Sequence, residues 1–234
     1  MKHSGIAVVL CAAVALATGA HAQTQAPMNT LTEQERAAGW RLLFDGTTTA
    51  GWRGFKKADM PAGWQAVDGA LSRVASAGDI VTIDEFSSFE LAFEWKIAPG
   101  GNSGVFFHVT EDIEAVWHSG PEYQILDNAA HKDGLTPDTS AGADYALHAP
   151  RRDASKPAGS WNHGRIIVRG SHVEHWLNGE KIVEYELGSP DWTARVAKSK
   201  FNVYPGFGRA PKGRIAIQDH GDAVAYRNIK IRTF

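Results

Sequence analysis

The sequence predicts an all-β fold, a sandwich or jelly roll of two antiparallel sheets, and three observations support this. Short runs of alternating apolar and polar residues recur along the chain, separated by turn residues. Asp68-Gly69 and Asn178-Gly179 each join two such runs, and both dipeptides are typical of two-residue hairpin turns. Only Leu31 to Ala38 has strong helix signals. Many short strands with few helices favour a sandwich.

The first 22 residues have the pattern of a secretory signal peptide. Lys2 gives a positive start, Ile6 to Ala17 is apolar, and Ala20-His21-Ala22 is a small-x-small cleavage site. The single cysteine, Cys11, lies inside this segment. We therefore expect a periplasmic or secreted protein, cleaved near Ala22, that is stabilised by burial without disulfides. The apolar run is too short to span a bilayer comfortably and no second one follows, so we expect no membrane insertion.

Three regions are expected after this reading: residues 1–22 as the signal, 23–38 as a leader with a short helix, and 39–234 as one β-sandwich domain. In the helix, Thr32 and Glu35 have the spacing of a capping box, and Gly39 is a typical stop. The expected strands are Trp40–Phe44, Trp64–Val67, Ala70–Val74, Phe89–Ile97, Asn102–Val109, Glu122–Leu126, Trp161–Val168, His172–Leu177, Lys181–Glu186, Arg214–Asp219 and Ala223–Arg232.

Two segments are less regular. Lys132 to Ser160 is rich in Gly, Pro, Asp and Ala and contains one short strand candidate, Asp144 to Leu147. A loop of this length in a compact domain is usually functional or disordered. Arg195 to Pro205 has no clear pattern.

Three of the strands predict a polar face opposite their core residues. In Asn102–Val109, we expect Val105, Phe107 and Val109 to be core and Asn102, Gly104, Phe106 and His108 to point outward. In the other two strands, the outward residues are Glu122 with Gln124, and Arg214, Ala216, Gln218 and His220. Amides, imidazoles and a few carboxylates on one sheet face suit the binding of sugar hydroxyls. Taken alone, Glu122 could belong to a solvated face and His220 to a turn.

The amino-acid composition limits the classes of molecule that this protein is expected to bind. The formal net charge of −2 argues against nucleic acid or an anionic membrane as the main partner. Eight tryptophans are many for 234 residues, and exposed ones would suit stacking on sugars. Among them, Trp161 is either a sugar platform or a core residue at the start of a strand. The oligomeric state is not readable from the sequence.

Several stretches together resemble the 3-keto-disaccharide hydrolase family. They are FELAFEWKI (89–97), GGNSGVFF (100–107), PEYQILDN (121–128), PAGSWN (157–162), HWLNG (175–179), GRIAIQDHG (213–221) and YRNIKIR (226–232). The resemblance runs from about Trp40 to Phe234 and implies a concanavalin A-like jelly roll that acts on 3-keto-glycosides in exported sugar catabolism. Two departures put loop contacts in doubt: Gly142-Ala143-Asp144-Tyr145 replaces Gly-Ala-Leu-Tyr, and HVTE (108–111) marks a subgroup.

The implied chemistry assigns roles to these residues. A ketone at C3 acidifies the C2 hydrogen, so a base can remove it and the resulting enediolate can expel the group on C1. Glu122 and His220 are the catalytic candidates, and His108 is a further candidate for the base. An oxyanion would be held by amides or by a divalent metal such as calcium or manganese; no organic cofactor is expected. The expected substrate contacts are Asn102, His108, Gln124, Asp127, Tyr145, Trp161 and Gln218.

Two other functions fit the same pattern. A non-catalytic carbohydrate-binding module could use the same face without cleaving the sugar. An ordinary glycosidase needs two close carboxylates, and only Asp127 or Asp219 could join Glu122. A metal held by His108 and Glu111 is a further possibility, although their spacing suits a helix better than a strand.

Overall fold

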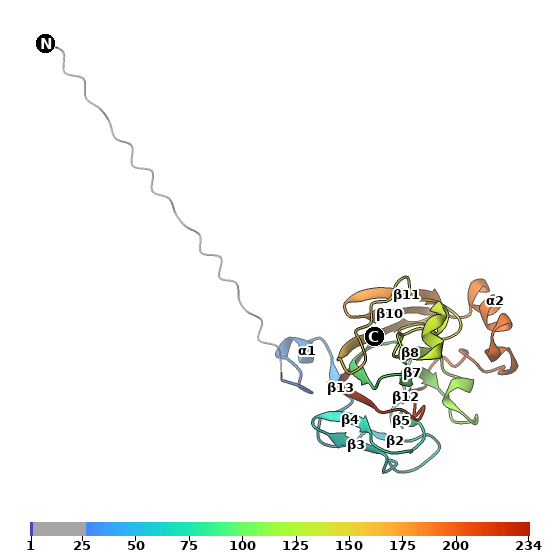
Figure 1. Ribbon diagram of the computed structural model, residues 1–234, viewed down its shortest axis with the longest axis horizontal. Helices are drawn as coiled ribbons and strands as arrows, with labels where there is room; N and C mark the ends of the chain where they lie inside the picture. The colour runs from blue at the N-terminus through green and yellow to red at the C-terminus, as the bar shows by residue number, and fades with distance from the viewer. Residues whose placement is uncertain (2–26) are drawn as a thin grey trace.

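Two antiparallel sheets make up most of the protein, as its computed structural model shows (Figure 1). The structure describes Met1 and residues 27–234, so the predicted signal peptide and its cleavage site lie outside the described residues. The sheets and the scarcity of helices confirm the predicted all-β sandwich. None of the helices in residues 27–234 is both long and apolar enough to cross a bilayer.

The larger sheet has eight strands in the described part of the chain. Its order is β11 (Glu180–Glu186), β10 (His172–Leu177), β9 (Asn162–Arg169), β6 (Phe89–Ile97), β13 (Val224–Thr233), β4 (Ala70–Arg73) and β3 (Trp64–Val67), with β1 (Arg41–Leu42) paired to β13. The smaller sheet has the order β2 (Trp52–Gly54), β5 (Ile80–Thr82), β12 (Arg214–Ile217), β7 (Asn102–Val109) and β8 (Glu122–Leu126).

Both predicted hairpins form with the expected turns. Val67 pairs with Ala70, and Asp68 and Gly69 have φ values of 49° and 74°. Asn178 and Gly179, with φ values of 50° and 88°, join β10 to β11 in the same way. Positive φ at both central residues is the requirement of a type I′ turn, which explains why these dipeptides predict hairpins.

The helical segments differ more from expectation. Helix α1 (Glu33–Ala37) has the predicted capping box, in which Thr32 Oγ1 accepts from the Glu35 backbone N–H at 3.1 Å. Helix α2 (Pro190–Lys198) was not predicted, although Ser189 at the N-cap followed by Pro190 is a helix-start signal. The 3-10 segments are η1 (Val116–His118), η2 (Lys132–Leu135), η3 (Pro137–Thr139) and η4 (Lys200–Val203).

The predicted strand at Asp144–Leu147 is wrong. Asp144 makes only isolated bridges to Tyr123 and His148, and the backbone turns back so that Leu147 N–H donates to Asp144 O at 2.9 Å. The short strands β2 and β5 were also missed, because three residues are too few for a clear alternation.

The main core lies between the two sheets. On β6 the predicted core residues Phe89, Leu91, Phe93, Trp95 and Ile97 are all buried, with 0–3% exposure. Phe93 packs edge-on against Tyr123 of β8 with ring centroids 5.5 Å apart, which joins the two sheets. A second apolar cluster covers the outer face of the smaller sheet and consists of Val81, Phe106, Val109, Val116 and Ala216. This outer face carries the candidate site.

Candidate active site

Glu122 is a buried carboxyl on the outer face of the smaller sheet. It pairs with Phe106 on β7, and its carboxyl group lies above Gly104, where a side chain would overlap it. Only 6% of the residue is exposed. Burial raises the pKa of Glu122 to about 8; the nearby Lys200 lowers it, and Asp79, Asp144 and Asp133 raise it further. A carboxyl with a pKa this close to neutrality can both accept and return a proton.

Three amides surround this carboxyl, as the alternation of the strands predicts. Gly104 is central: Gln124 is its partner on β8, and the Gln218 backbone N–H donates to Gly104 O at 2.9 Å from the other side. Asn102 lies two residues along β7, on the same face. The side-chain oxygens of Asn102, Gln124 and Gln218 are buried and have no hydrogen-bond partner within residues 27–234. Buried acceptors left unpaired are costly, so three of them on one face make this face a candidate ligand site.

The long loop between β8 and β9 forms one wall of the site. The Tyr145 backbone N–H donates to Glu122 O at 3.1 Å, which fixes the tyrosine beside the carboxyl. Its hydroxyl donates to Asp133 Oδ2 at 3.3 Å. Burial raises the pKa of Tyr145 well above its usual range, so its hydroxyl stays protonated. The structure therefore places Tyr145 next to Glu122.

A second wall was not found from the sequence. Trp117 packs against the apolar cluster of the outer face and contacts Tyr204 edge-on, with centroids 5.2 Å apart. Lys200 places its ammonium 4.3 Å from the Tyr145 ring centroid and 5.3 Å from that of Trp117. Both Trp117 and Lys200 belong to segments without strand periodicity, so the alternation that identified the other residues did not reach them.

His220 lies at the edge of this group. The residue is exposed, and its ring is 6.4 Å from the ring of His131, edge to face. It follows Gln218 by two residues. Its catalytic role stays a prediction.

Asp127 and Asp219 both accept backbone hydrogen bonds. Asp127 accepts from the N–H groups of Gly100 at 2.8 Å and Ala129 at 3.1 Å. Asp219 accepts from those of Ala77 at 2.7 Å and Gly78 at 2.8 Å, and also pairs with Arg73. Both carboxylates thus hold loops together.

The expected direction of His108 is wrong. His108 has φ 54°, and the pairing of β7 with β12 shifts at this point. This bulge turns the ring inward, edge-on to Phe89 and Phe107, with Nε2 2.8 Å from Ser87 O. Val109 takes the outward position instead and joins the cluster on the outer face. His108 therefore lies on the opposite side of the sheet from Glu122, and burial lowers its pKa.

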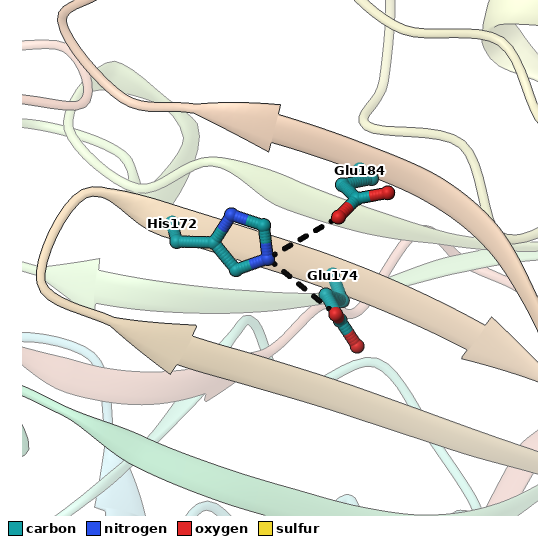
Figure 2. A group of neighbouring side chains, drawn as sticks. All are labelled: His172, Glu174 and Glu184. Atoms are coloured by element: carbon teal, nitrogen blue, oxygen red, sulfur yellow. Dashed lines mark hydrogen bonds and ion pairs between the residues drawn. The ribbon is translucent and has the colours of Figure 1, made fainter.

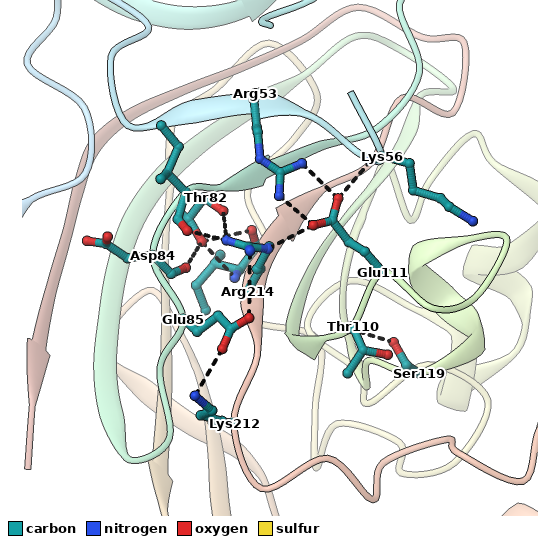
Figure 3. A network of polar contacts seen from close by, with 12 residues as sticks. Arg53, Lys56, Thr82, Asp84, Glu85, Thr110, Glu111, Ser119, Lys212 and Arg214 are labelled. Atoms are coloured by element: carbon teal, nitrogen blue, oxygen red, sulfur yellow. Dashed lines mark hydrogen bonds and ion pairs between the residues drawn. The ribbon is translucent and has the colours of Figure 1, made fainter. Parts of the chain in front are cut away.

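Glu111 does not join His108 in a metal site. It accepts two hydrogen bonds from the Arg53 guanidinium, one from the Lys56 backbone N–H at 2.7 Å and one from Arg214 Nε at 3.0 Å (Figure 3). These contacts lower the pKa of Glu111 to about 2, the bond from Arg53 being the largest cause. Glu111 thus fastens the segment after β7, which leads to Trp117, onto β2 and β12.

Trp161 packs on the larger sheet, whereas Glu122 lies on the smaller sheet. Its ring contacts Lys96 Nζ at 4.9 Å and the Arg227 guanidinium at 4.0 Å, from β6 and β13 of the larger sheet. It is therefore neither a core residue nor part of the wall around Glu122.

One cluster in the described residues has the ligand types and spacing of a metal site: His172, Glu174 and Glu184, on β10 and β11 (Figure 2). Lys181 Nζ lies 3.2 Å from Glu174 Oε1 and 2.9 Å from Glu184 Oε2. Hydrogen bonds to carboxylates, above all to Glu186, raise the pKa of His172 and favour its protonated form. The cluster is therefore a set of ion pairs. Around Glu122, no comparable group of His, Cys, Asp and Glu occurs in residues 27–234.

Comparison with known proteins identifies the family. Residues 39–232 match the family described as the 3-keto-alpha-glucoside-1,2-lyase-like domain. This chain belongs to that family. It is 34% identical to a protein of Bacteroides thetaiotaomicron named 3-keto-disaccharide hydrolase, over 88% of this chain and 82% of the relative. The resemblance read from the seven motifs is thereby confirmed.

Solved structures confirm the fold. A protein of Parabacteroides distasonis, described as a candidate glycosyl hydrolase, superimposes with a TM-score of 0.83 and 36% identity, covering 89% of this chain and all of that one. A second candidate glycosyl hydrolase from the same organism has a TM-score of 0.70 and 31% identity, over 83% of this chain and 99% of that one. A carbohydrate binding module of Bacillus subtilis, at 10% identity and a TM-score of 0.50 over 78% of this chain and 96% of that one, shares the fold alone.

Proposed function

We propose that this protein cleaves 3-keto-glycosides by removing the proton on C2 and eliminating the group on C1. The family and the named relative support hydrolysis of a carbohydrate. The observation that carries the proposal is Glu122: a buried carboxyl whose pKa is about 8, lying beside three unpartnered amide oxygens. An ordinary glycosidase would need a second free carboxylate, and the two acids considered for that role bind backbone N–H groups.

The steps use one base. The Glu122 carboxylate takes the proton from C2, the C–H electron pair forms the C2–C3 double bond, and the C3 oxygen becomes negative. Collapse of this enediolate restores the C3 carbonyl, forms a C1–C2 double bond and breaks the C1–O bond; Glu122 returns its proton to the leaving oxygen. Water then adds to C1 and a proton to C2, which completes a net hydrolysis.

The surrounding residues bind and orient the sugar. The oxygens of Asn102, Gln124 and Gln218 are positioned to accept hydrogen bonds from sugar hydroxyls. Tyr145 and Trp117 offer aromatic surfaces for a pyranose ring. His220 is placed to contact the outer end of the ligand. A bound divalent cation is a separate proposal. It would stabilise the oxyanion as a Lewis acid, and its protein ligands would be neutral amide oxygens.

The same proposal includes export. The predicted signal peptide would direct the enzyme to the periplasm or out of the cell, where it would degrade oxidised disaccharides. N-terminal sequencing of the protein secreted by an expressing cell tests this: a mature chain that begins at Gln23 supports it, and an intact Met1 in the cytosol contradicts it.

The test is a substrate comparison. The mature protein is incubated with a 3-keto-disaccharide and with the unoxidised disaccharide, each with and without a chelator. Release of the reducing sugar from the keto substrate alone supports the elimination route. If the chelator abolishes this release, a divalent cation is part of the mechanism. Release from both substrates contradicts the need for the ketone. Release from neither, with retention of the protein on a glycan column, indicates a binding module instead.

A further inference from the structure

Lys200 carries an ammonium group that acts on Glu122 and makes no ion pair within residues 27–234. It begins η4, where Ser199 Oγ accepts from the Phe201 backbone N–H at 3.1 Å. Its Nζ lies 4.3, 5.2 and 5.3 Å from the ring centroids of Tyr145, Phe201 and Trp117. Glu122 and Asp133 act on it as charges, but no hydrogen bond to it occurs within the described residues.

Other lysines of the chain are paired differently. Lys181 lies 2.9 Å from Glu184, Lys212 lies 3.3 Å from Glu85, and Lys230 pairs with Glu35. Two arginines near the outer face, Arg53 and Arg214, form ion pairs with Glu111. Lys200 instead rests on aromatic faces, which attract a cation but leave its N–H groups available. Within residues 27–234, Lys200 is therefore a cation that acts on Glu122 and whose N–H groups make no hydrogen bond to the protein.

The other donors beside Glu122 are neutral. The amides of Asn102 and Gln218 carry N–H groups as well as oxygens, whereas the Gln124 amide donates to Thr139 O at 3.3 Å and the Tyr145 hydroxyl donates to Asp133. An enediolate forming on a sugar needs a positive or hydrogen-bond-donating group aimed at its oxygen. An ammonium on rigid aromatic rings meets this need with little reorganisation.

We propose that Lys200 is a catalytic residue of the site, which donates to the C3 oxygen of the keto sugar as that oxygen becomes negative and which favours the ionised form of Glu122. The inference rests on the proposed function. No covalent bond forms to Lys200 and it transfers no proton; its charge balances the charge that moves from the Glu122 carboxylate to the C3 oxygen.

The test compares Lys200→Met and Lys200→Arg with a matched control, Lys198→Met, an exposed lysine two residues earlier. Turnover of a 3-keto-glucoside is measured from about pH 5 to pH 10. We expect Lys200→Met to lower kcat by about a hundredfold. We also expect its acid limb to move to higher pH, because Glu122 then faces Asp79, Asp133 and Asp144 without the cation. Lys200→Arg should keep the position of the limb, and Lys198→Met should match the wild type.

The experiment distinguishes a wrong role for Lys200 from a wrong proposed function. If the wild type releases sugar and Lys200→Met has an unchanged acid limb, the role of Lys200 is wrong, whatever happens to KM. If the wild type does not act on the keto substrate, the proposed function is wrong. Thermal unfolding checks each variant, and Lys200→Gln replaces the Met variant if that protein unfolds early.

Discussion

The Glu122 carboxyl occupies the space above Gly104 that any other residue at position 104 would fill. A Cβ built on Gly104 would overlap Glu122 Oε1 and would lie 3.0 Å from both Glu122 Cδ and Phe106 Cε2. Gly104 of β7 therefore leaves a space without a side chain, and the carboxyl of Glu122 on β8 fills it. Gly104, the third glycine of GGNSGVFF, therefore has a steric role in the site rather than a role in a turn.

Gly104→Ala should displace the carboxyl. We expect at least a hundredfold loss of kcat, roughly the size of a displaced catalytic group, and a loss of about 1–3 kcal/mol of stability from overpacking. Gly206→Ala is the matched control, because nothing lies within 4 Å of a Cβ there. Steady-state kinetics and urea unfolding measure both effects. Wild-type turnover in Gly104→Ala would show that the carboxyl does not act from this position.

Glu122→Gln should show that the acid costs stability at high pH. The ordinary carboxyl pKa is 4.5, and burial raises it to about 8 in the folded protein. Between these values the unfolded chain loses its proton while the folded protein keeps it, so rising pH destabilises the wild type. The stability of Glu122→Gln relative to the wild type should therefore increase across this window and level off above it. Urea unfolding at several pH values measures the difference; a constant difference would contradict the raised pKa.

Trp117 and Trp161 should differ in their effect on catalysis. Trp117 borders Lys200 and the outer-face cluster, whereas Trp161 contacts Lys96 and Arg227 on the larger sheet. We expect Trp117→Ala to raise KM for the keto substrate by about tenfold, the value of one stacking surface. Trp161→Ala should change KM by less than about twofold. The reverse result would move the binding surface to the larger sheet.

Glu111→Gln should weaken the segment that carries Trp117. It leaves Arg53 and Arg214 close together without the shared anion, and the loss should be about 2 kcal/mol. Because the folded pKa of Glu111 is about 2, its contribution is present above pH 4.5 and disappears as the pH falls toward 2. The control is Glu114→Gln, at an exposed residue of the same loop. Equal stability of the two variants in denaturant would contradict the role of Glu111.

Alternation along strands was enough to predict part of the site. Glu122, Gln124, Asn102 and Gln218 have outward positions that follow from a period of two, and these residues come together because β8, β7 and β12 are neighbours. The pattern failed at His108, because a bulge shifts the register by one residue. Gly213, where a Cβ would clash with the His108 backbone, permits this bulge. In the sequence, the sign of this bulge is Gly213, directly before β12.

Other features were beyond a local pattern. Lys200 and Trp117 reach the site from 3-10 turns about 80 residues apart in the chain, and no periodicity relates them to Glu122. Trp161 directly precedes β9, and β9 belongs to the larger sheet rather than to the sheet that carries Glu122. Short strands such as β2 and β5 also carry too little pattern to detect.

Transfer of solvent deuterium to C2 tests the central claim most directly. The wild type and Glu122→Gln are incubated with a 3-keto-glucoside in D₂O, and the C2 position is followed by NMR against a blank without protein. We predict that the wild type incorporates deuterium at C2 and releases the aglycone, with an acid limb near pH 8, and that Glu122→Gln does neither above the blank. Release of the aglycone by the wild type without deuterium at C2, or full activity in Glu122→Gln, would contradict the account.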